Sequence, residues 1–268
     1  MPVIETQSDN ARHAAALAMA AREAGEYALK MFRGKIRSWT KEADSPVSEV
    51  DIAVDDLLRA RLSAPGIGWL SEESRDDRSR MTAERVFIVD PIDGTRAYLA
   101  GKPDWSISAA LVEAGRPIAA AVYAPVDDEM FVAAVGEGAR RNGIPISANA
   151  GGDLPGSMVA GPRGFLDRLA KIAPGIEMSP KIHSLALRIT RVAQGHVDAA
   201  FASHNARDWD LAAADLLVHE AGGTMTTLAG EPLVYNLHNP VHGALLAAGR
   251  ARHAAMMDVI RRSRETFK

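Results

Sequence analysis

A run of apolar residues that ends in two closely spaced carboxylates limits the fold of this chain more than any other stretch. Residues 85–89, Arg-Val-Phe-Ile-Val, form a strand pattern that leads directly into Asp90-Pro91-Ile92-Asp93-Gly94-Thr95. Pro91 has no N–H to donate, so we expect strand pairing to stop there. Gly94 permits a tight turn, and Thr95 is suited to beginning a helix. The stretch therefore predicts a buried strand, an acidic turn and a helix.

The two acids of this turn, Asp90 and Asp93, are hard oxygen donors of the kind that Mg²⁺ prefers. The N–H groups at the start of the following helix are suited to phosphate. Together, these features indicate phosphoryl chemistry. Taken alone, the same two acids are equally well explained as turn and N-cap residues, so the rest of the chain has to decide.

Composition excludes several other kinds of protein. The 268 residues carry a net charge of −3, which favours neither a nucleic-acid nor a membrane surface. There is no cysteine, so disulfides, thiolate metal sites and a cysteine nucleophile are excluded. We see no secretory signal and no run of about 20 apolar residues. A soluble cytoplasmic protein is the expectation.

The first part of the chain predicts two helices followed by an antiparallel meander of strands, because consecutive strands follow one another without helices between them. The expected elements are a helix from Ser8 or Asp9 to about Phe32, a polar loop 41–51, a second helix after it, and strands at 68–70, 105–112, 117–123 and 129–135, with a turn at Asn142-Gly143.

Beyond a turn-rich boundary at 151–156, helices and strands are expected to alternate. The expected helices are 164–173, 184–194, 209–221 and one at the C-terminus, and the expected strands are 197–201, 224–228 and 243–248. The pattern predicts an α+β, or α/β, layered sandwich. We expect one unit over 1–268, with sub-lobes of about 1–150 and 151–268 and a site where they meet.

Three further acids have simple structural explanations when each is taken alone. Asp51 follows Ser48 at capping-box spacing, Glu72 is one of two adjacent loop acids, and Asp210 lies in the first turn of a helix, where the dipole favours it. The charged loop 75–80 is interpreted as a solvated connection, and a lid is an additional hypothesis. Trp105 and Trp209 are expected in the core.

Four motifs in order resemble the inositol monophosphatase superfamily of Mg²⁺-dependent, lithium-sensitive phosphomonoesterases. The resemblance covers about residue 10 to the C-terminus and implies the layered fold that this superfamily shares with fructose-1,6-bisphosphatase. The motifs are Ser45-Pro46-Val47-Ser48-Glu49-Val50-Asp51, Ser71-Glu72-Glu73-Ser74, Val89-Asp90-Pro91-Ile92-Asp93-Gly94-Thr95 and Trp209-Asp210-Leu211-Ala212-Ala213.

The resemblance also implies site roles. Asp51 and Thr95 would orient and deprotonate the attacking water, with Glu72 assisting. The N–H groups of Gly94 and Thr95 would hold phosphate oxygens. A homodimer acting on a small phosphorylated substrate is implied, with two or three Mg²⁺ ions in each active site. The implied metal ligands are Glu72, Asp90, Asp93, Asp210 and the backbone carbonyl of Ile92.

A different phosphatase class, the haloacid dehalogenases, uses D-x-D-G-T with an acid–base Asp two positions after the nucleophile. Here the two acids are three positions apart, and a proline follows the first of them. This alternative is therefore disfavoured.

The substrate is less clearly indicated. Bacterial bisphosphate nucleotidases carry a lysine, suited to a second phosphate, at the position where this chain has Arg188. Arginine also binds phosphate, although Arg188 is equally well explained as a solvent-facing residue of a helix. Residues 202–207 lack the glutamate with which inositol monophosphatases bind inositol, and His183 alters the family's Gly-Ser-Ser turn. We favour a 3′(2′),5′-bisphosphate nucleotidase that converts 3′-phosphoadenosine 5′-phosphate to AMP.

Other activities stay open. Inositol-1-phosphate hydrolysis is a close alternative, and a related sugar or histidinol phosphatase is another. A regulatory binding protein on the same fold is an alternative of a different class. The intact set of acids argues against a dead site.

Overall fold

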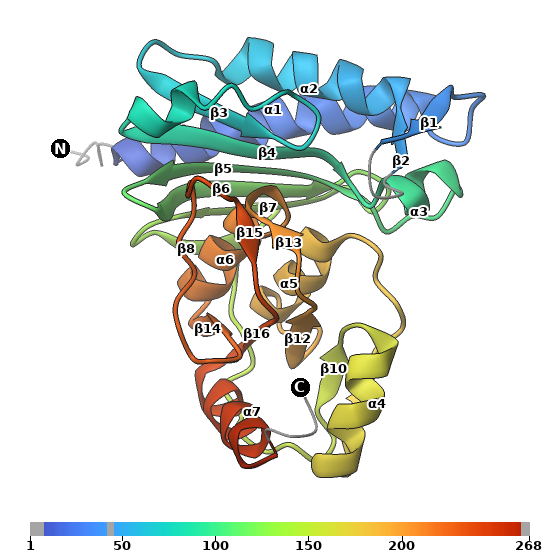
Figure 1. The fold of residues 1–268 in the computed structure, drawn as a ribbon, viewed down its shortest axis with the longest axis vertical. Helices are drawn as coiled ribbons and strands as arrows, with labels where there is room; N and C mark the ends of the chain where they lie inside the picture. Colours follow the sequence, from blue (N-terminus) through green and yellow to red (C-terminus); the bar gives the residue numbers. More distant parts are fainter. Residues whose placement is uncertain (1–7, 42–45, 264–268) are drawn as a thin grey trace, which may run out of the picture.

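The computed structural model describes residues 8–41 and 46–263 and arranges them in five alternating layers of helix and sheet (Figure 1). Helices α1 and α2 form the first layer, a seven-stranded sheet the second, α5 and α6 the third, a five-stranded sheet the fourth, and α4 and α7 the fifth. The helices are α1 (Asp9–Met31), α2 (Glu49–Leu62), α3 (Thr95–Leu99), α4 (Arg163–Ile172), α5 (Leu185–Ala193), α6 (Asp208–Glu220) and α7 (Arg250–Arg262).

The seven-stranded sheet has its strands in chain order, β3-β4-β5-β6-β7-β8-β9. All neighbours are antiparallel except β3 and β4, which are parallel and are joined by the charged loop. The meander predicted from the sequence is therefore confirmed from β4 onward. The strands are β3 (Ile67–Ser71), β4 (Arg85–Asp93), β5 (Ser106–Glu113), β6 (Arg116–Ala124), β7 (Glu129–Ala134), β8 (Gly138–Arg141) and β9 (Ile144–Ile146).

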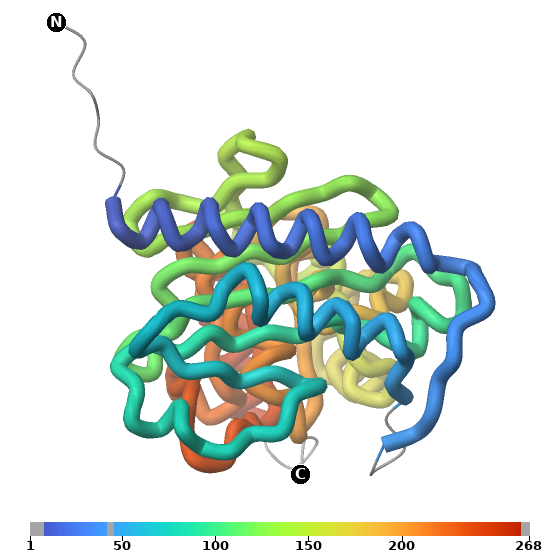
Figure 2. Tube along the Cα trace, turned by 90° about the horizontal axis from the view of Figure 1, so that it is seen from above, coloured from blue at the N-terminus to red at the C-terminus, as the bar shows by residue number. Residues whose placement is uncertain are grey.

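Helices α1 and α2 lie side by side across one face of this sheet (Figure 2). Small alanines on the buried face of α1 let the helix approach β6 closely, because no bulky side chain holds the two backbones apart. Ser48 caps α2 in the predicted capping box with Asp51, and both of its reciprocal bonds are present. The first layer is thus fixed by close packing and by a cap that belongs to the site.

The five-stranded sheet has the order β11-β10-β12-β16-β14 and packs against α5 and α6 on its inner side. On its outer side, Phe165 of α4 and Met256 of α7 belong to one apolar cluster with Phe201. The strands of this sheet are β10 (Met158–Ala160), β11 (Glu177–Met178), β12 (Ala199–Ala202), β14 (Gly223–Thr227) and β16 (Leu245–Gly249). Outside the two large sheets, β1 (Ser38–Thr40) pairs with β2 (Pro46–Ser48), and β13 (Ala206–Arg207) pairs with β15 (Val241–His242).

The structure corrects the expectation that β4 stops pairing at Pro91. Asp90 pairs with Ser108 and Asp93 with Ser106, so three steps on β4 oppose two on β5. The extra residue forms a β-bulge, which accommodates a proline that has no N–H for the ladder. The strand therefore runs through both acids.

Two loops also differ from expectation. The predicted polar loop 41–51 contains β2, which pairs with β1 just before the loop, and α2 already begins at Glu49. Residues 42–45 of the loop, including the Ser45 that begins one motif, lie outside the described residues. In the charged loop 75–80, Arg80 is fully buried, because Asp76 and the carbonyl oxygen of Leu237 satisfy its guanidinium. The loop is thus anchored at one end and is not the fully solvated connection that we expected.

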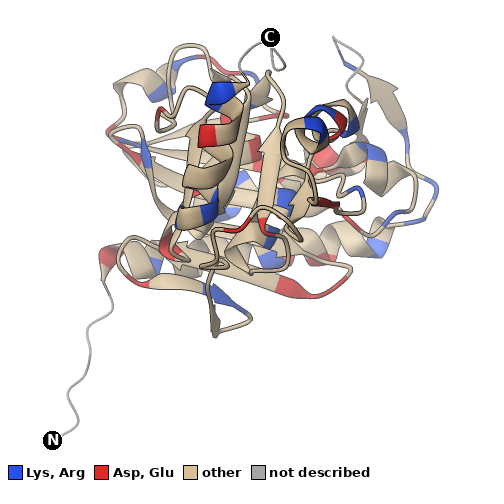
Figure 3. Cartoon of the chain, turned by 90° about the horizontal axis from the view of Figure 1, so that it is seen from below, with Lys and Arg blue, Asp and Glu red and all other residues tan. Residues whose placement is uncertain are grey.

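Charged residues of both signs are interspersed along the ribbon when the molecule is viewed from below (Figure 3). No helix in the described part of the chain is both long and apolar enough to cross a bilayer.

Candidate active site

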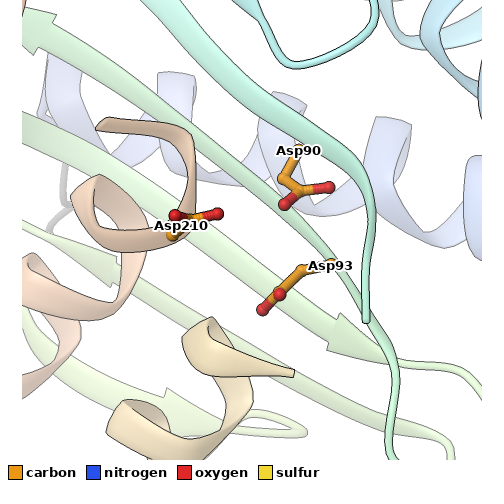
Figure 4. A group of neighbouring side chains, drawn as sticks. All are labelled: Asp90, Asp93 and Asp210. Carbon is orange, nitrogen blue, oxygen red and sulfur yellow. The ribbon is translucent and has the colours of Figure 1, made fainter. Parts of the chain in front are cut away.

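Three aspartates from two elements gather where the second and third layers meet. One carboxylate oxygen of each of Asp90, Asp93 and Asp210 lies within 4.8 Å of the others. Figure 4 shows Asp90 and Asp93 on β4, and Asp210 across from them at the start of α6. We call these three residues the carboxylate cluster. The bulge in β4 and the first turn of α6 place them together.

Burial and mutual repulsion both oppose ionisation of the carboxylate cluster. Burial raises the pKa of Asp90 well above its usual range, and the neighbouring Glu72, Asp93 and Asp210 raise it further. The pKa of Asp210 is also raised well above its usual range, first by burial and then by Asp93. The buried Oδ1 atom of Asp90 has no hydrogen-bond partner among the described residues. A divalent cation would remove both penalties, so the donor set fits Mg²⁺.

Asp93 is held from the other side by the start of α5. Its Oδ2 atom accepts hydrogen bonds from the Ser184 hydroxyl at 2.6 Å and the Ala186 N–H at 2.6 Å, and its Oδ1 atom accepts one from the Leu185 N–H at 3.1 Å. Burial raises the pKa of Asp93, and these three donors oppose the rise. The orientation of this carboxylate is therefore fixed before any metal binds.

Asp51 and Thr95 are also brought together. The Thr95 hydroxyl lies 3.0 Å from Asp51 Oδ1 and 3.0 Å from the carbonyl oxygen of Ile92. Asp51 Oδ2 accepts the Ser48 N–H at 2.8 Å and also contacts the Ser48 hydroxyl. Burial raises the pKa of Asp51, which is 0 % exposed. A buried carboxylate that contacts a hydroxyl is suited to accepting a proton through it.

Glu72 follows the last residue of β3, beside β4. Burial raises the pKa of Glu72, and the charges of Asp93 and Asp51 raise it further, so Glu72 interacts electrostatically with the site. Its carboxylate Oε1 atom is 3.9 Å from the Lys41 ammonium group, which also contacts the carboxylate of Glu73. Burial raises the pKa of Glu73 to about 7. The Glu73 side chain is 1 % exposed and the Glu72 side chain 22 %, so neither acid is a fully solvated loop charge.

Asp55 is a supporting residue that sequence reasoning missed. It lies one turn after Asp51 on α2, is 5 % exposed, and accepts hydrogen bonds from the hydroxyls of Ser71, at 2.6 Å, and Ser74. These serines flank the two glutamates of the β3 turn. Two acids four positions apart on one helix face were the signal that could have identified it.

Gly94 occupies the turn between β4 and α3 with φ at +97°, a conformation that L side chains rarely adopt. A Cβ atom at this position would lie 3.3 Å from the backbone nitrogen of Ser184. The glycine therefore allows β4 and the start of α5 to approach closely, which in turn allows Asp93 to reach α5.

A cavity of about 820 Å³ adjoins the carboxylate cluster. Leu185 and Ala206 line the cavity on the side nearest the cluster. The N–H of Leu185 donates to Asp93, and Ala206 precedes Arg207, whose N–H donates to Asp210. The ionisable residues that line the cavity are Arg163, Lys181, Arg188 and His204, and none of the described lining residues is Asp or Glu. We call this space the cationic cavity.

Arg188 does not face solvent freely. Its Nη2 atom donates to the carbonyl oxygen of Ile182 at 2.8 Å, and its Nη1 atom lies 3.4 Å from that of Phe201. Burial lowers the pKa of Arg188, while the charges of Asp93 and Asp104 oppose this. The residue therefore links the segment before α5 to β12 and forms part of the cavity wall.

The histidines near the site fall into two groups. His183 lies 2.5 Å from Asp104, and His242 lies 2.6 Å from the buried Asp208, so both have carboxylate partners. His204 lines the cationic cavity, and His238 contacts Arg78 in the charged loop. Trp105 is fully buried, as expected, and Trp209 is half-buried against the core.

Comparison with known proteins shows the family to which the chain is similar. Residues 9–264 match the model of the inositol monophosphatase family. The Nus factor SuhB of Haemophilus influenzae is 32 % identical over 219 residues, which cover 76 % of this chain and 80 % of that protein.

Solved structures give the same result. The extragenic suppressor protein SuhB from Bartonella henselae superposes with a TM-score of 0.83 at 26 % identity, covering 93 % of this chain and 98 % of that one. An IMPase/NADP phosphatase complexed with NADP and Ca²⁺ gives a TM-score of 0.82 at 20 % identity, covering 95 % and 97 %, and this supports the fold alone. The predicted layered architecture is confirmed.

Proposed function

The chain belongs to the inositol monophosphatase family of phosphatases, and from that premise we propose that it is a Mg²⁺-dependent phosphomonoester hydrolase in which Asp51 and Thr95 activate the attacking water. The observation that carries the proposal is the buried carboxylate cluster next to the Asp51–Thr95 hydrogen bond.

The metal would be held by Asp90, Asp93, Asp210, Glu72 and the carbonyl oxygen of Ile92. When bound, Mg²⁺ supplies charge neutralisation for the phosphate and the leaving alkoxide. Of these ligands, Asp93 is already oriented by α5, whereas Asp90 has an oxygen without a described partner.

The protein's own groups would handle the proton. The Thr95 hydroxyl accepts a hydrogen bond from the water and passes a proton to Asp51 Oδ1, 3.0 Å away. The Ser48 N–H and hydroxyl hold the opposite oxygen of Asp51, so this carboxylate keeps one face toward Thr95. Glu72 assists by orienting the water, and the N–H groups of Gly94 and Thr95 hold phosphate oxygens.

We favour 3′-phosphoadenosine 5′-phosphate as the substrate, hydrolysed to AMP and phosphate, with Arg188 as a candidate ligand for the second phosphate. The cationic lining of the cavity supports this choice, because a neutral polyol is better bound by carboxylates that accept its hydroxyls. Inositol-1-phosphate stays the close alternative, followed by a small sugar or histidinol phosphate.

A regulatory role is a second candidate, because several relatives are named Nus factor SuhB. For this chain, Mg²⁺ binding without hydrolysis of any phosphate ester would favour it. We also propose a homodimer, which light scattering tests, and one folded unit with sub-lobes of about 1–150 and 151–268, which limited proteolysis tests.

The test is phosphate release with Mg²⁺ from 3′-phosphoadenosine 5′-phosphate and from inositol-1-phosphate. The wild type is compared with Thr95→Ala and Arg188→Ala, and melting temperatures show whether each variant folds. We expect hydrolysis of the nucleotide, loss of all hydrolysis in Thr95→Ala, and selective loss of nucleotide hydrolysis in Arg188→Ala. Preference for inositol-1-phosphate that Arg188→Ala leaves unchanged would contradict the nucleotidase assignment.

A further inference from the structure

The two walls of the cationic cavity contribute cations that differ in how fully they are already bonded. Arg188, on the inner wall, has its Nε and Nη2 atoms on the carbonyl oxygen of Ile182 and its Nη1 atom near that of Phe201. Arg163 and Lys181 lie on the outer wall, at the start of α4 and just before α5, and both are exposed. The inner cation therefore shapes the wall, and the outer cations are available to a ligand.

The hydrogen-bond donors of Arg163 and Lys181 support the view that these two cations are available to a ligand. The Nε atom of Arg163 bonds Asp167 at 2.8 Å, and its two terminal nitrogens have no partner among the described residues. Lys181 likewise has no hydrogen bond or ion pair within the described part of the chain. Two cations from separate segments that line one cavity can bind the oxygens of a single anion.

The geometry of the cavity also limits where such an anion can be. Leu185 and Ala206 line the cavity, and Leu185 also bonds Asp93, so the cavity is the space beside the metal site in which we place the alcohol portion of the ester. At about 820 Å³, the cavity is at the upper end of the range for small-molecule sites and has room for more than a six-carbon ring. A second anionic group of the same substrate would lie at the outer wall.

We propose that Arg163 and Lys181 bind a second phosphoryl group of the substrate, remote from the ester that is hydrolysed, and that they determine specificity for bisphosphorylated over monophosphorylated alcohols. This inference rests on the proposed phosphatase function. It adds Arg163 and Lys181, on the outer wall of the cavity, to Arg188 as ligands of the second phosphate, and Arg188 also holds the inner wall in place through Ile182 and Phe201.

The experiment compares two substrates that differ only in the second phosphate, adenosine 3′,5′-bisphosphate and adenosine 3′-monophosphate. The variant is the double substitution Arg163→Gln with Lys181→Gln. The matched control is Lys171→Gln, an exposed cation on α4 that does not line the cavity. The measured quantity is the ratio of kcat/KM for the bisphosphate to that for the monophosphate.

We expect the double variant to lower this ratio by about 10- to 100-fold, through KM for the bisphosphate, because the charge-assisted hydrogen bonds to the second phosphate are lost. Hydrolysis of the monophosphate should be unchanged in the double variant, and Lys171→Gln should leave both substrates unchanged.

An unchanged ratio in the double variant would overturn the inference while leaving the phosphatase function standing. Equal loss on both substrates would also overturn it, because a structural defect does not distinguish the two. If the wild type hydrolyses inositol-1-phosphate but neither adenosine ester, the inference fails and the family activity stands. If the wild type releases phosphate from none of them, the proposed function itself fails.

Discussion

Leu185 and Ala206 separate two regions that differ in charge, exposure and internal support. On one side, the carboxylate cluster is acidic and largely buried, and hydrogen bonds from the start of α5 and from Arg207 hold Asp93 and Asp210 in place. On the other side, the cationic cavity is open, positively charged and lined at its outer wall by exposed side chains. The first region has the precision that bond cleavage requires, and the second has the adaptability that suits a choice among substrates.

The largest expected effect comes from removing one charge of the carboxylate cluster. Asp90→Asn should lower Mg²⁺-dependent kcat by about 10³-fold, since metal-assisted charge stabilisation is worth several kcal/mol. Without Mg²⁺, the same variant should be more stable than the wild type by about 1 to 3 kcal/mol, because a buried like-charge repulsion is relieved.

Thermal unfolding with EDTA and with excess Mg²⁺ checks this prediction. Mg²⁺ should raise the melting temperature of the wild type and have little effect on the variant. A variant that is less stable than the wild type in EDTA would show that the cluster is stabilised internally and does not require a cation.

A smaller effect is expected from a residue that supports the cluster without belonging to it. Asp55→Asn should weaken the hydrogen bonds that hold the serines on either side of the β3 turn, and so displace Glu72. We expect the Mg²⁺ concentration for half-maximal activity to rise by about 10-fold, as is usual for residues that orient metal ligands. Saturating Mg²⁺ should restore most of kcat.

The control for this prediction is Asp56→Asn, the exposed neighbour on the same helix, which should behave as the wild type. If Asp55→Asn lowers kcat at saturating Mg²⁺ and leaves the half-maximal concentration unchanged, then Asp55 does not act through the metal site.

The smallest effect is expected far from both regions. His219 lies 3.1 Å from the buried Asp215 near the end of α6, and the interaction with this carboxylate raises the pKa of His219, although burial and the charges of Arg116 and Arg250 oppose the rise. A raised histidine pKa adds stability below the unfolded value of about 6.5, and that stability is lost as pH rises through the folded value.

His219→Gln should therefore lower the melting temperature more at pH 6 than at pH 9. The difference should correspond to at most about 0.5 kcal/mol, because the side chain is 44 % exposed and is screened by solvent. Melting curves at the two pH values measure it. An equal loss at both values would indicate that the histidine contributes packing alone.

The same contrast between regions explains what could be predicted from the sequence. The helices and the meander follow from local periodicity and capping, and the Ser48–Asp51 capping box was predicted and is present. The turns at Ala114-Gly115 and Asn142-Gly143 have the positive φ angles that such hairpins require. The acids of the cluster are placed by short motifs, each of which fixes its own backbone.

The cationic cavity could not be predicted in this way. Arg163, Lys181 and His204 come from three segments with no shared motif, and only the packing of α4, α5 and the β12 end brings them to one space. The buried Arg80 was missed for a similar reason, since its partner Leu237 is 157 positions away. Periodicity carries no information about contacts at that distance.

The bonds between Asp93 and the start of α5 have a consequence for the order in which the molecule forms. Asp93 and its partners at the start of α5 are separated by 91 to 93 positions, and Asp210, the third acid of the cluster, lies beyond α5 in the sequence. Such distant contacts close slowly, because the entropy of a long loop must be lost before any bond compensates for it. During synthesis, β3 and β4 therefore emerge before α5 and α6, and the proposed metal site can be completed only after α6 has left the ribosome.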